Sequence, residues 1–301
     1  INPLSGYGPC CVTFGTDGNS PKGLGLMSIG GVLYMTFSRL DRTTGIIEPL
    51  FNPSIITSPD HGATWNNMQS PATFTSTGTD MVPAGTNLWT GNTPSSFAGE
   101  TFVMYGADDG TLGYGVADNQ IDNADAYIYV MTSDGGGEAC CAGVANGDHY
   151  YLARVSRGKI GHLHASDWQF YISGDGTLDA NWTSSQGSAG AVLTNTGKLG
   201  LPNIQYLPAL NRYLLSTFYY PSGAGTPTNS VQLFYEAAHP WGPWTQIASQ
   251  SFPTTGNYSP IVLQASALAA TLPTVTITML STQSFTGANY NLFYGTVTVT
   301  H

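Results

Sequence analysis

Short runs of apolar, β-branched and aromatic residues recur along the whole chain, separated by clusters of Gly, Pro, Asn and Asp. Residues 24–38 read LGLMSIGGVLYMTFS, two apolar runs around a Gly-Gly pair, which predicts a β-hairpin. No stretch shows convincing helical periodicity, so we expect an all-β protein. The further strands are expected at residues 100–105, 126–132, 149–155, 168–172, 204–207, 212–219, 231–236, 244–247, 259–263, 274–280 and 290–300.

The expected strands fall into groups of about four, and each group ends in a run that carries a tryptophan. Trp65, then Trp168 or Trp182, then Trp244 occupy this position. Recurring four-stranded units indicate a β-propeller, and a β-sandwich, the alternative, explains the recurrence less well. We expect a five-bladed propeller that forms a single domain over residues 1–301.

The net charge of the chain limits the classes of molecule that it could bind. The chain has 8 Lys and Arg against 18 Asp and Glu, a formal net charge of -10. Nucleic-acid binding needs clustered cations, and an acidic surface repels anionic membranes and polymers. No apolar run approaches the roughly 18 residues of a membrane span. We therefore expect no nucleic-acid or membrane partner, and we favour neutral or locally recognised substrates.

The four cysteines form two adjacent pairs, Cys10 with Cys11 and Cys140 with Cys141. Their spacing fits no zinc site, so disulfides and an oxidising, extracellular location are expected. One pairing links the N-terminus to the second pair, and the other closes two vicinal bridges. A start at Ile1 fits a processed chain, and Asn181 and Asn257 lie in glycosylation sequons.

Residues 58–65 read SPDHGATW, which matches the Asp-box S-x-D-x-G-x-T-W without a mismatch. In this motif the Asp side chain accepts backbone N–H groups across a tight turn, and Gly62 permits a positive φ. The motif is specific for sialidase-like propellers and has a structural role there. We therefore expect Asp60 to be a turn residue and not a catalyst.

Four segments together resemble a family of secreted propellers of uncharacterised function, related to endo-D-arabinanases and more distantly to five-bladed furanosidases. They are KGLGL at 22–26 with GVLYM at 31–35, the Asp-box, DAYIYV at 125–130 with YLARV at 151–155, and RYLL at 212–215 with EAAHPWGPWT at 236–245. The resemblance covers roughly residues 12–250. It implies an extracellular glycoside hydrolase acting on a furanoside-containing or other polysaccharide.

Two features depart from this family. Few residues precede the segment at 14–18, where family members carry a full first blade. Either the first blade is incomplete, or the N-terminus completes the last blade in a different way. The adjacent cysteine pairs are also not a feature of the family.

A propeller places its ligand site on one face of its central channel, where loops from several blades meet, and the Asp-box lies on the opposite face. The expected site-face loops are residues 15–23, 39–53, 71–98, 133–148, 174–200, 220–230 and 281–289. Their acidic residues are Asp17, Asp41, Glu48, Asp80, Asp134, Glu138, Asp148, Asp175 and Asp179. Glycoside hydrolysis needs two carboxyl groups flanking the bond. Related furanosidases draw them from different blades, which implies Asp17 as base or nucleophile, Asp41 as orienting group and Glu138 as acid. The alternative for each is a solvated loop carboxylate.

Further side chains are candidates for binding substrate. Arg39 and Arg42 flank Asp41 and could hold a substrate carboxylate or keep Asp41 ionised. His149 and Tyr150 open an expected strand near the site face, where His and Tyr could serve as base and acid of a polysaccharide lyase. The aromatic side chains Trp89 and Tyr220 could stack on sugar rings.

No cofactor is required by this chemistry. Asp118, Asp122 and Asp125 form an oxygen-rich cluster that could hold calcium, although a hydrogen-bonded loop explains the cluster as well. The expected partner is a polysaccharide or oligosaccharide. A non-catalytic, lectin-like surface protein is the remaining alternative to the two enzyme classes, because a fold does not dictate its function.

Overall fold

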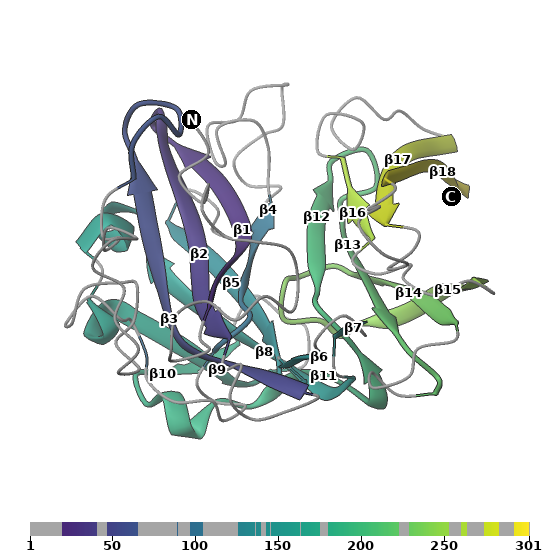
Figure 1. Cartoon of the computed structure of the whole chain (residues 1–301), viewed down its shortest axis with the longest axis horizontal. Helices are drawn as coiled ribbons and strands as arrows, with labels where there is room; N and C mark the ends of the chain where they lie inside the picture. The colour runs from purple at the N-terminus through teal and green to yellow at the C-terminus, as the bar shows by residue number, and fades with distance from the viewer. Residues whose placement is uncertain are drawn as a thin grey trace.

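The structure is a computed structural model. It describes residues 20–40, 47–65, 89, 97–104, 126–135, 137–139, 143–144, 146–162, 164–174, 180–222, 229–252, 260–263, 274–282 and 292–300. Strands dominate these ranges, as expected (Figure 1). Three short 3-10 helices accompany them, namely η5 (Arg157–His162), η6 (Ala165–Asp167) and η7 (Gln186–Ser188). Within the described residues, no helix has both the length and the apolar character to cross a membrane.

The first sheet has the strand order β1-β2-β3-β6-β7. The predicted hairpin is present in it, because Gly30 and Gly31 turn with φ of 57° and 80° and Ile29 pairs with Val32. The strands are β1 (Ser20–Ile29), β2 (Val32–Leu40), β3 (Ile47–Ser58), β6 (Gly137–Ala139) and β7 (Gly143–Val144).

The second sheet has the order β10-β9-β8-β5-β4-β12-β13-β14-β15, and β11 pairs with β8 beside this path. Two antiparallel groups meet at a parallel pair, β4 with β12, where Ile204 pairs with Val103. A parallel pair of this kind is the arrangement expected of the first strands of two neighbouring propeller blades. The strands are β4 (Thr101–Met104), β5 (Tyr127–Ser133), β8 (Gly147–Ser156), β9 (Trp168–Ser173), β10 (Asn181–Thr183), β11 (Ala191–Leu199), β12 (Asn203–Leu207), β13 (Arg212–Tyr219), β14 (Ser230–Ala237) and β15 (Thr245–Phe252).

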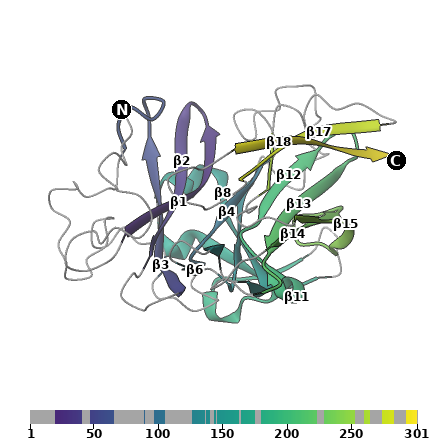
Figure 2. The same ribbon diagram turned by 45° about the vertical axis from the view of Figure 1, so that its right-hand side comes forward.

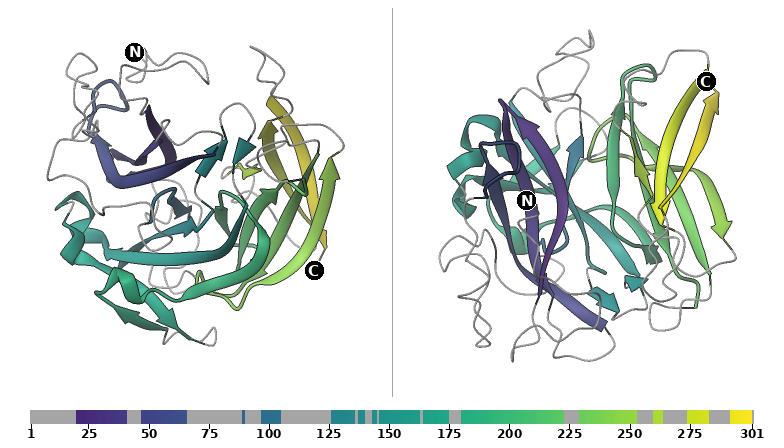
Figure 3. Two further views of the ribbon diagram at one scale, coloured as in Figure 1. Left: turned by 60° about the horizontal axis from the view of Figure 1, so that its bottom comes forward. Right: turned by 45° about the horizontal axis from the view of Figure 1, so that its top comes forward.

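The third sheet comprises β16 (Ile261–Val262), β17 (Thr274–Thr282) and β18 (Leu292–Thr300). It is joined to the second sheet by the Ser216 hydroxyl, which donates to the Pro260 carbonyl at 2.6 Å. Figure 2 shows β17 and β18 beside β12 and β13. In the left view of Figure 3 the sheets follow one another round the molecule in chain order, from purple through teal and green to yellow.

The core explains why the middle strands read as nearly continuous apolar runs. Along β5, Tyr129 and Met131 pack into one buried cluster, whereas Ile128 and Val130 pack into another. Because successive side chains of a strand point to opposite faces, β5 is covered on both sides. A two-layer sandwich would leave one face of each sheet to solvent. Burial on both faces therefore favours radially stacked sheets, although the number of five blades stays a prediction.

The turn after β3 has the local geometry expected of residues 58–65. Asp60 Oδ1 accepts the Thr64 N–H and the Ser58 hydroxyl, each at 2.8 Å, and Oδ2 accepts the Thr64 hydroxyl at 2.7 Å. Gly62 has a φ of 88°, a region that favours glycine. The hydrogen bonds from Thr64, followed by that from Ser58, lower the pKa of Asp60 from 3.8 to about 2. Asp60 therefore has a structural role here, and its membership of the Asp-box class stays a prediction.

Some segments expected to be loops contain strands. The expected loop at 39–53 includes the start of β3, where Pro49 and Pro53 obscure the pattern because proline is unusual within strands. The expected loop at 174–200 contains β10 and β11. In β11 the polar residues between Leu193 and Leu199 are exposed or half-buried and hide the strand signal. Strand β11 pairs with β8 at His149, and the start of β3 pairs with β6 at Glu138.

Candidate functional site

Several strand ends meet at one place, which we call the rim: the start of β3 with β6, the end of β5, the start of β8, and the ends of β11 and β13. The Ser133 hydroxyl donates to the Leu199 carbonyl at 3.1 Å, which joins β5 to β11. Asn146 donates to the Tyr220 carbonyl at 2.8 Å and accepts the Tyr220 N–H at 2.9 Å, which joins the start of β8 to the end of β13. Segments that the sequence expects at the site face are therefore neighbours.

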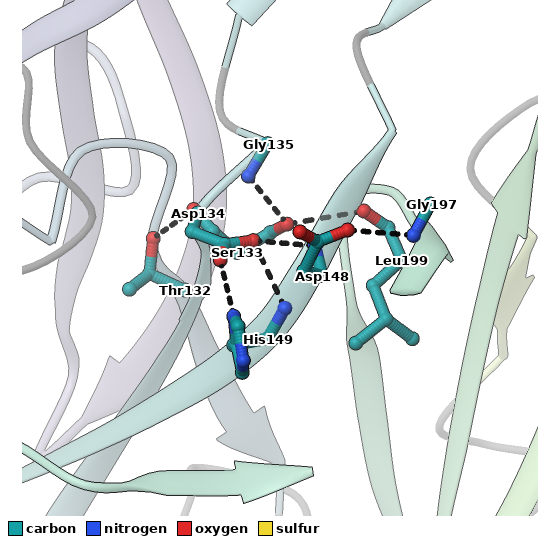
Figure 4. A network of polar contacts seen from close by, with 8 residues as sticks. All are labelled: Thr132, Ser133, Asp134, Gly135, Asp148, His149, Gly197 and Leu199. Carbon is teal, nitrogen blue, oxygen red and sulfur yellow. Dashed lines mark hydrogen bonds and ion pairs between the residues drawn. The ribbon is translucent and has the colours of Figure 1, made fainter. Parts of the chain in front are cut away.

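At the rim, one carboxylate holds one imidazole. Asp134 Oδ2 lies 2.7 Å from His149 Nδ1, and Asp134 Oδ1 accepts the backbone N–H groups of His149 at 2.9 Å and Asp148 at 2.7 Å (Figure 4). Three contacts to one carboxylate leave little freedom to either side chain. A hydrogen bond from Nδ1 selects the tautomer in which Nε2 can accept a proton.

The two members of this pair differ in exposure. The Asp134 side chain is 12% exposed, whereas that of His149 is 36% exposed. The carboxylate is therefore a buried support and the imidazole is the group that solvent, or a ligand, can reach. Tyr151 lies on the same strand with its ring centroid 6.1 Å from that of His149. Burial, followed by the negative charge of Asp134, raises the pKa of the Tyr151 hydroxyl, which keeps it protonated at neutral pH.

The backbone around this pair is itself held by side chains. Asp148 Oδ1 accepts the Gly197 N–H at 2.7 Å, and the Ser133 hydroxyl accepts the Gly135 N–H at 3.0 Å (Figure 4). The Gly197 φ of 69° places the β11 backbone in a conformation that favours glycine. A rigid surrounding shell of this kind fixes the position of a group that must meet a substrate.

Two glutamates are partners in the backbone register of the first sheet. Strand β6 pairs antiparallel with β3, and Glu138 is the direct partner of Glu48 in this register. Residues directly opposite one another in an antiparallel ladder lie on the same face, with Cβ atoms about 4.5–5.5 Å apart. The sequence named both residues as site-face carboxylates but gave no reason to pair them.

A third glutamate lies at the start of β4 and is fully buried. The Glu100 side chain has no exposed surface, and its Oε2 accepts the Ser38 hydroxyl at 3.3 Å. The segment before it lies beside the end of β5, because the Thr132 hydroxyl donates to the Ala98 carbonyl at 2.9 Å. Glutamate is rarely fully buried without a specific partner. The sequence alone did not single out Glu100. Its position directly before the apolar run TFVM could have indicated that this glutamate is buried.

Three of the predicted substrate-binding residues lie in the core. Tyr150 is fully buried, and its hydroxyl lies 2.8 Å from the Gly200 carbonyl oxygen and 2.5 Å from the Thr217 hydroxyl. Tyr220 is fully buried, and Trp89 packs edge-on to Trp168 with ring centroids 5.0 Å apart. In this conformation a substrate would not reach these side chains. Alternation along β8 explains the outcome for Tyr150, since its neighbours His149 and Tyr151 point the other way.

One cation at the rim was not anticipated from the sequence. Lys198 is exposed near the end of β11, with its Nζ 5.9 Å from the centroid of the Tyr219 ring. A lysine over an aromatic ring gains cation–π stabilisation at this distance. No sequence signal distinguishes Lys198 from a surface lysine, because β11 itself was not expected.

The remaining candidates are placed only in part. The backbone of Arg39 lies in β2, paired with Phe51, and Asn181 is exposed in β10, where a glycan could be attached. The other candidates lie outside the described residues, namely Asp17, Asp41, Arg42, Cys10, Cys11, Cys140, Cys141, Asn257, Asp118, Asp122 and Asp125.

Comparisons with known proteins give structural similarities only. No family model and no curated protein matches the chain. Solved structures similar to it include a GH43 endo-arabinanase from Bacillus licheniformis, with 8% identity, a TM-score of 0.43, and coverage of 90% of this chain and 71% of that one. Another is Zg3597, a family 117 glycoside hydrolase from Zobellia galactanivorans, with 11% identity, a TM-score of 0.46, and coverage of 97% and 70%.

A third similar structure, from Bacteroides ovatus, has 12% identity and a TM-score of 0.45; the match covers 87% of this chain and spans 54% of that one, about half its length. At these identities and TM-scores the likeness assigns no activity to this chain.

Proposed function

We propose that the protein is a secreted, carbohydrate-active enzyme that hydrolyses glycosidic bonds of a polysaccharide, with its active site at the rim. The observation that carries the proposal is the backbone register that pairs Glu138, in the strand that follows Asp134, with Glu48. Hydrolysis of a glycoside uses two carboxyl groups, one protonated and one ionised. In this proposal Glu48 is a neighbouring carboxylate that opposes ionisation of Glu138, because two adjacent carboxylates resist ionising together.

In this proposal Glu138 donates the proton to the leaving oxygen, Asp17 is the base or nucleophile, and Asp41 orients its partners. Arg39 and Arg42 contribute charge around Asp41. His149 meets the substrate through Nε2, by hydrogen bonding to a sugar hydroxyl, while Asp134 fixes its orientation. Asp134 is thus a positioning residue, since its own oxygens are engaged by His149 and the backbone.

The substrate class follows from charge and from the sequence resemblance. A net charge of -10 disfavours polyanions, so a neutral polymer is the better substrate. The resemblance to endo-D-arabinanases adds furanoside-containing polymers as the first to test. Secretion is supported by the two adjacent cysteine pairs, because disulfides persist in oxidising compartments. The five-bladed propeller with one Asp-box belongs to the same proposal.

One observation favours a second candidate, a polysaccharide lyase. Asp134, His149 and Tyr151 provide an oriented base with a protonated phenol nearby, the pair of groups needed to abstract a proton beside a uronate carboxyl and protonate the leaving oxygen. A lyase leaves a double bond in its product, which a hydrolase does not.

A single panel of polymers separates the candidates. The full chain is incubated with furanoside-containing polymers, neutral glucans and uronate polymers, and both reducing ends and ultraviolet absorbance of an unsaturated product are measured. We expect new reducing ends from a furanoside polymer without absorbance. Absorbance from a uronate polymer would instead establish the lyase, and absence of both signals would leave a binding protein.

Two matched variants connect the activity to the rim. Glu138→Gln removes the proposed acid while keeping the shape of the side chain. Glu236→Gln is the control, because Glu236 lies away from the rim. It is near the end of the β13–β14 pair where Tyr213 pairs with Ala237, whereas the opposite end, where Tyr219 pairs with Val231, is at the rim. Equal activity of the two variants would contradict the assignment of the site.

A further inference from the structure

A cluster of two histidines and one aspartate lies far from the rim, between β8 and β9. His162 ends η5, His164 precedes the single turn of η6, and Asp167 ends that turn. Strand β8 begins at the rim with Gly147 and ends at Ser156, directly before η5. Ten residues of strand span about 30 Å, so this cluster is separate from the proposed active site.

The three side chains converge on one oxygen atom. His162 Nδ1 lies 3.3 Å from Asp167 Oδ2, and His164 Nδ1 lies 3.9 Å from the same oxygen. The two imidazole rings are 5.9 Å apart between centroids. The turn itself brings them together, because the Asp167 N–H donates to the His164 carbonyl at 3.0 Å.

The ligand atoms of the three residues all lie within 4.8 Å of one another, and the two separations that end on Asp167 Oδ2 approach the spacing of ligands around a tetrahedral metal ion. Zinc binds histidine nitrogen and carboxylate oxygen at about 2.0–2.2 Å, so two ligands at the tetrahedral angle lie about 3.4 Å apart. The contact of His162 with Asp167 already has this length, and that of His164 exceeds it by a few tenths of an ångström. Both imidazoles are reachable from solvent, since His162 is 54% and His164 is 70% exposed, while Asp167 is 14% exposed.

We propose that His162, His164 and Asp167 bind a divalent transition-metal ion, zinc in the first place, through two imidazole nitrogens and one carboxylate oxygen. Imidazole and carboxylate together suit zinc, cobalt, nickel and copper, whereas magnesium and calcium prefer sites made only of oxygen. Three protein ligands leave a fourth position for water or an external ligand. The sequence analysis foresaw no metal at this place.

The neighbouring cation makes the proposal sharper. Lys159 Nζ donates to Asp167 Oδ1 at 2.8 Å and leaves Oδ2 directed to the histidines. The ammonium group orients the carboxylate, but its positive charge also opposes a second cation nearby. Removing the charge of Lys159 should therefore strengthen metal binding, a result that a merely structural cluster of hydrogen bonds would not give.

The position of the cluster gives the ion a structural consequence. Trp168 follows Asp167 directly and is buried in the core cluster that also contains Ile160 of η5. An ion held by His162, His164 and Asp167 would cross-link η5 to the start of β9. Because it binds the folded chain, such an ion raises the apparent stability in proportion to the logarithm of its concentration.

The test uses the full chain and metal ions alone. Zn²⁺ binding is measured by calorimetry at neutral pH, and Co²⁺ is added separately to record its visible spectrum, which is intense for tetrahedral and weak for octahedral coordination. We expect one equivalent of Zn²⁺ and a tetrahedral Co²⁺ spectrum, with no saturable binding of Mg²⁺ at this site. We also expect Zn²⁺ to raise Tm.

Four variants locate the site. His164→Ala and Asp167→Asn should each weaken Zn²⁺ binding by at least about 100-fold and abolish the tetrahedral spectrum, since even residues that only support a ligand change affinity 10–100-fold. Lys159→Ala should bind several-fold more tightly. His149→Gln, at the rim, is the matched control and should bind as the parent chain does.

Absence of Zn²⁺ binding by the parent chain would overturn the proposal, as would equal binding by the parent and His164→Ala. Loss of binding in His149→Gln alone would also overturn it, because the ion would then lie at the rim. Circular dichroism of each variant confirms that a loss is not caused by unfolding.

Discussion

Asp134 holds His149 at two points of the same residue, the side-chain Nδ1 at 2.7 Å and the backbone N–H at 2.9 Å. A carboxylate that accepts from both atoms fixes where the side chain leaves the strand as well as how the ring is turned. The ring therefore presents Nε2 in a constant direction at the rim. Such a clamp has a purpose if the imidazole must meet a ligand in one geometry.

We predict that His149→Gln lowers kcat/KM about 10–100-fold, the equivalent of losing one hydrogen bond to a charged or strongly polar group. The loss should appear mainly in KM if His149 binds a sugar hydroxyl. Steady-state kinetics on the polymer found active in the panel provide the measurement. A loss confined to kcat, about 10²–10⁴-fold, would instead identify His149 as the proton-transfer group.

Asp134→Ala should reproduce the kinetic defect of His149→Gln, because the imidazole loses its orientation. The double variant should be little worse than either single variant, since residues that act as a unit are not additive. Asp167→Asn, which removes a carboxylate beside other histidines far from the rim, is the control and should retain parental kinetics. Additive losses in the double variant would separate Asp134 from the function of His149.

The pairing of Glu48 with Glu138 gives a third prediction. Glu138→Gln should reduce kcat about 10²–10⁴-fold, the usual contribution of a general acid or base. Glu48→Gln should also reduce kcat, because it removes the charge that opposes ionisation of Glu138. Parental activity in Glu138→Gln would exclude this residue as the acid, whatever the effect of the Glu48 change.

Local patterns predicted most of the fold. The Gly-Gly hairpin and the strands around Tyr129 and Leu215 were evident because β-branched and aromatic runs between turn residues report strands directly. Strand β11 was missed because its apolar positions are separated by polar residues, which are exposed or half-buried. A strand of this kind is fixed by its partner, here β8, and not by its own sequence.

The candidate site was less predictable than the fold. The sequence placed His149 and Asp134 near the same expected face, but their contact depends on the pairing of β5 with β8. The same holds for Glu48 opposite Glu138, which lie 90 positions apart in the chain and meet only through β3 and β6. The sequence placed Tyr150 at the site face, whereas the structure buries it. Which face of a strand is buried depends on the elements that cover it, and the strand's own sequence does not name them.

The turn at residues 58–65 predicts a pH-dependent stability. Its hydrogen bonds lower the pKa of Asp60 to about 2 from the 3.8 of an unfolded chain, so the ionised carboxylate stabilises the folded state above pH 3.8. This stabilisation is lost as the pH falls towards 2. Asp60→Ala should therefore lower Tm by a few degrees at neutral pH, and the difference from the parent should shrink between pH 4 and pH 2. Thermal unfolding over this range measures it, and a difference that does not change with pH would contradict the role of the charge.

Tyr150→Phe distinguishes a core residue from a substrate-binding one. The change removes only the hydroxyl, which lies between the Gly200 carbonyl and the Thr217 hydroxyl in a fully buried position. Loss of this buried group should lower the free energy of unfolding by about 1–3 kcal/mol, because the Gly200 carbonyl loses a partner without gaining water. Denaturant unfolding measures this loss of stability. The kcat/KM of the variant should stay within about two-fold of the parent value. A lost substrate contact worth 1.4 kcal/mol would instead change it about ten-fold. A variant with parental stability and weakened substrate binding would return Tyr150 to the site surface and would mean that this part of β8 opens in solution.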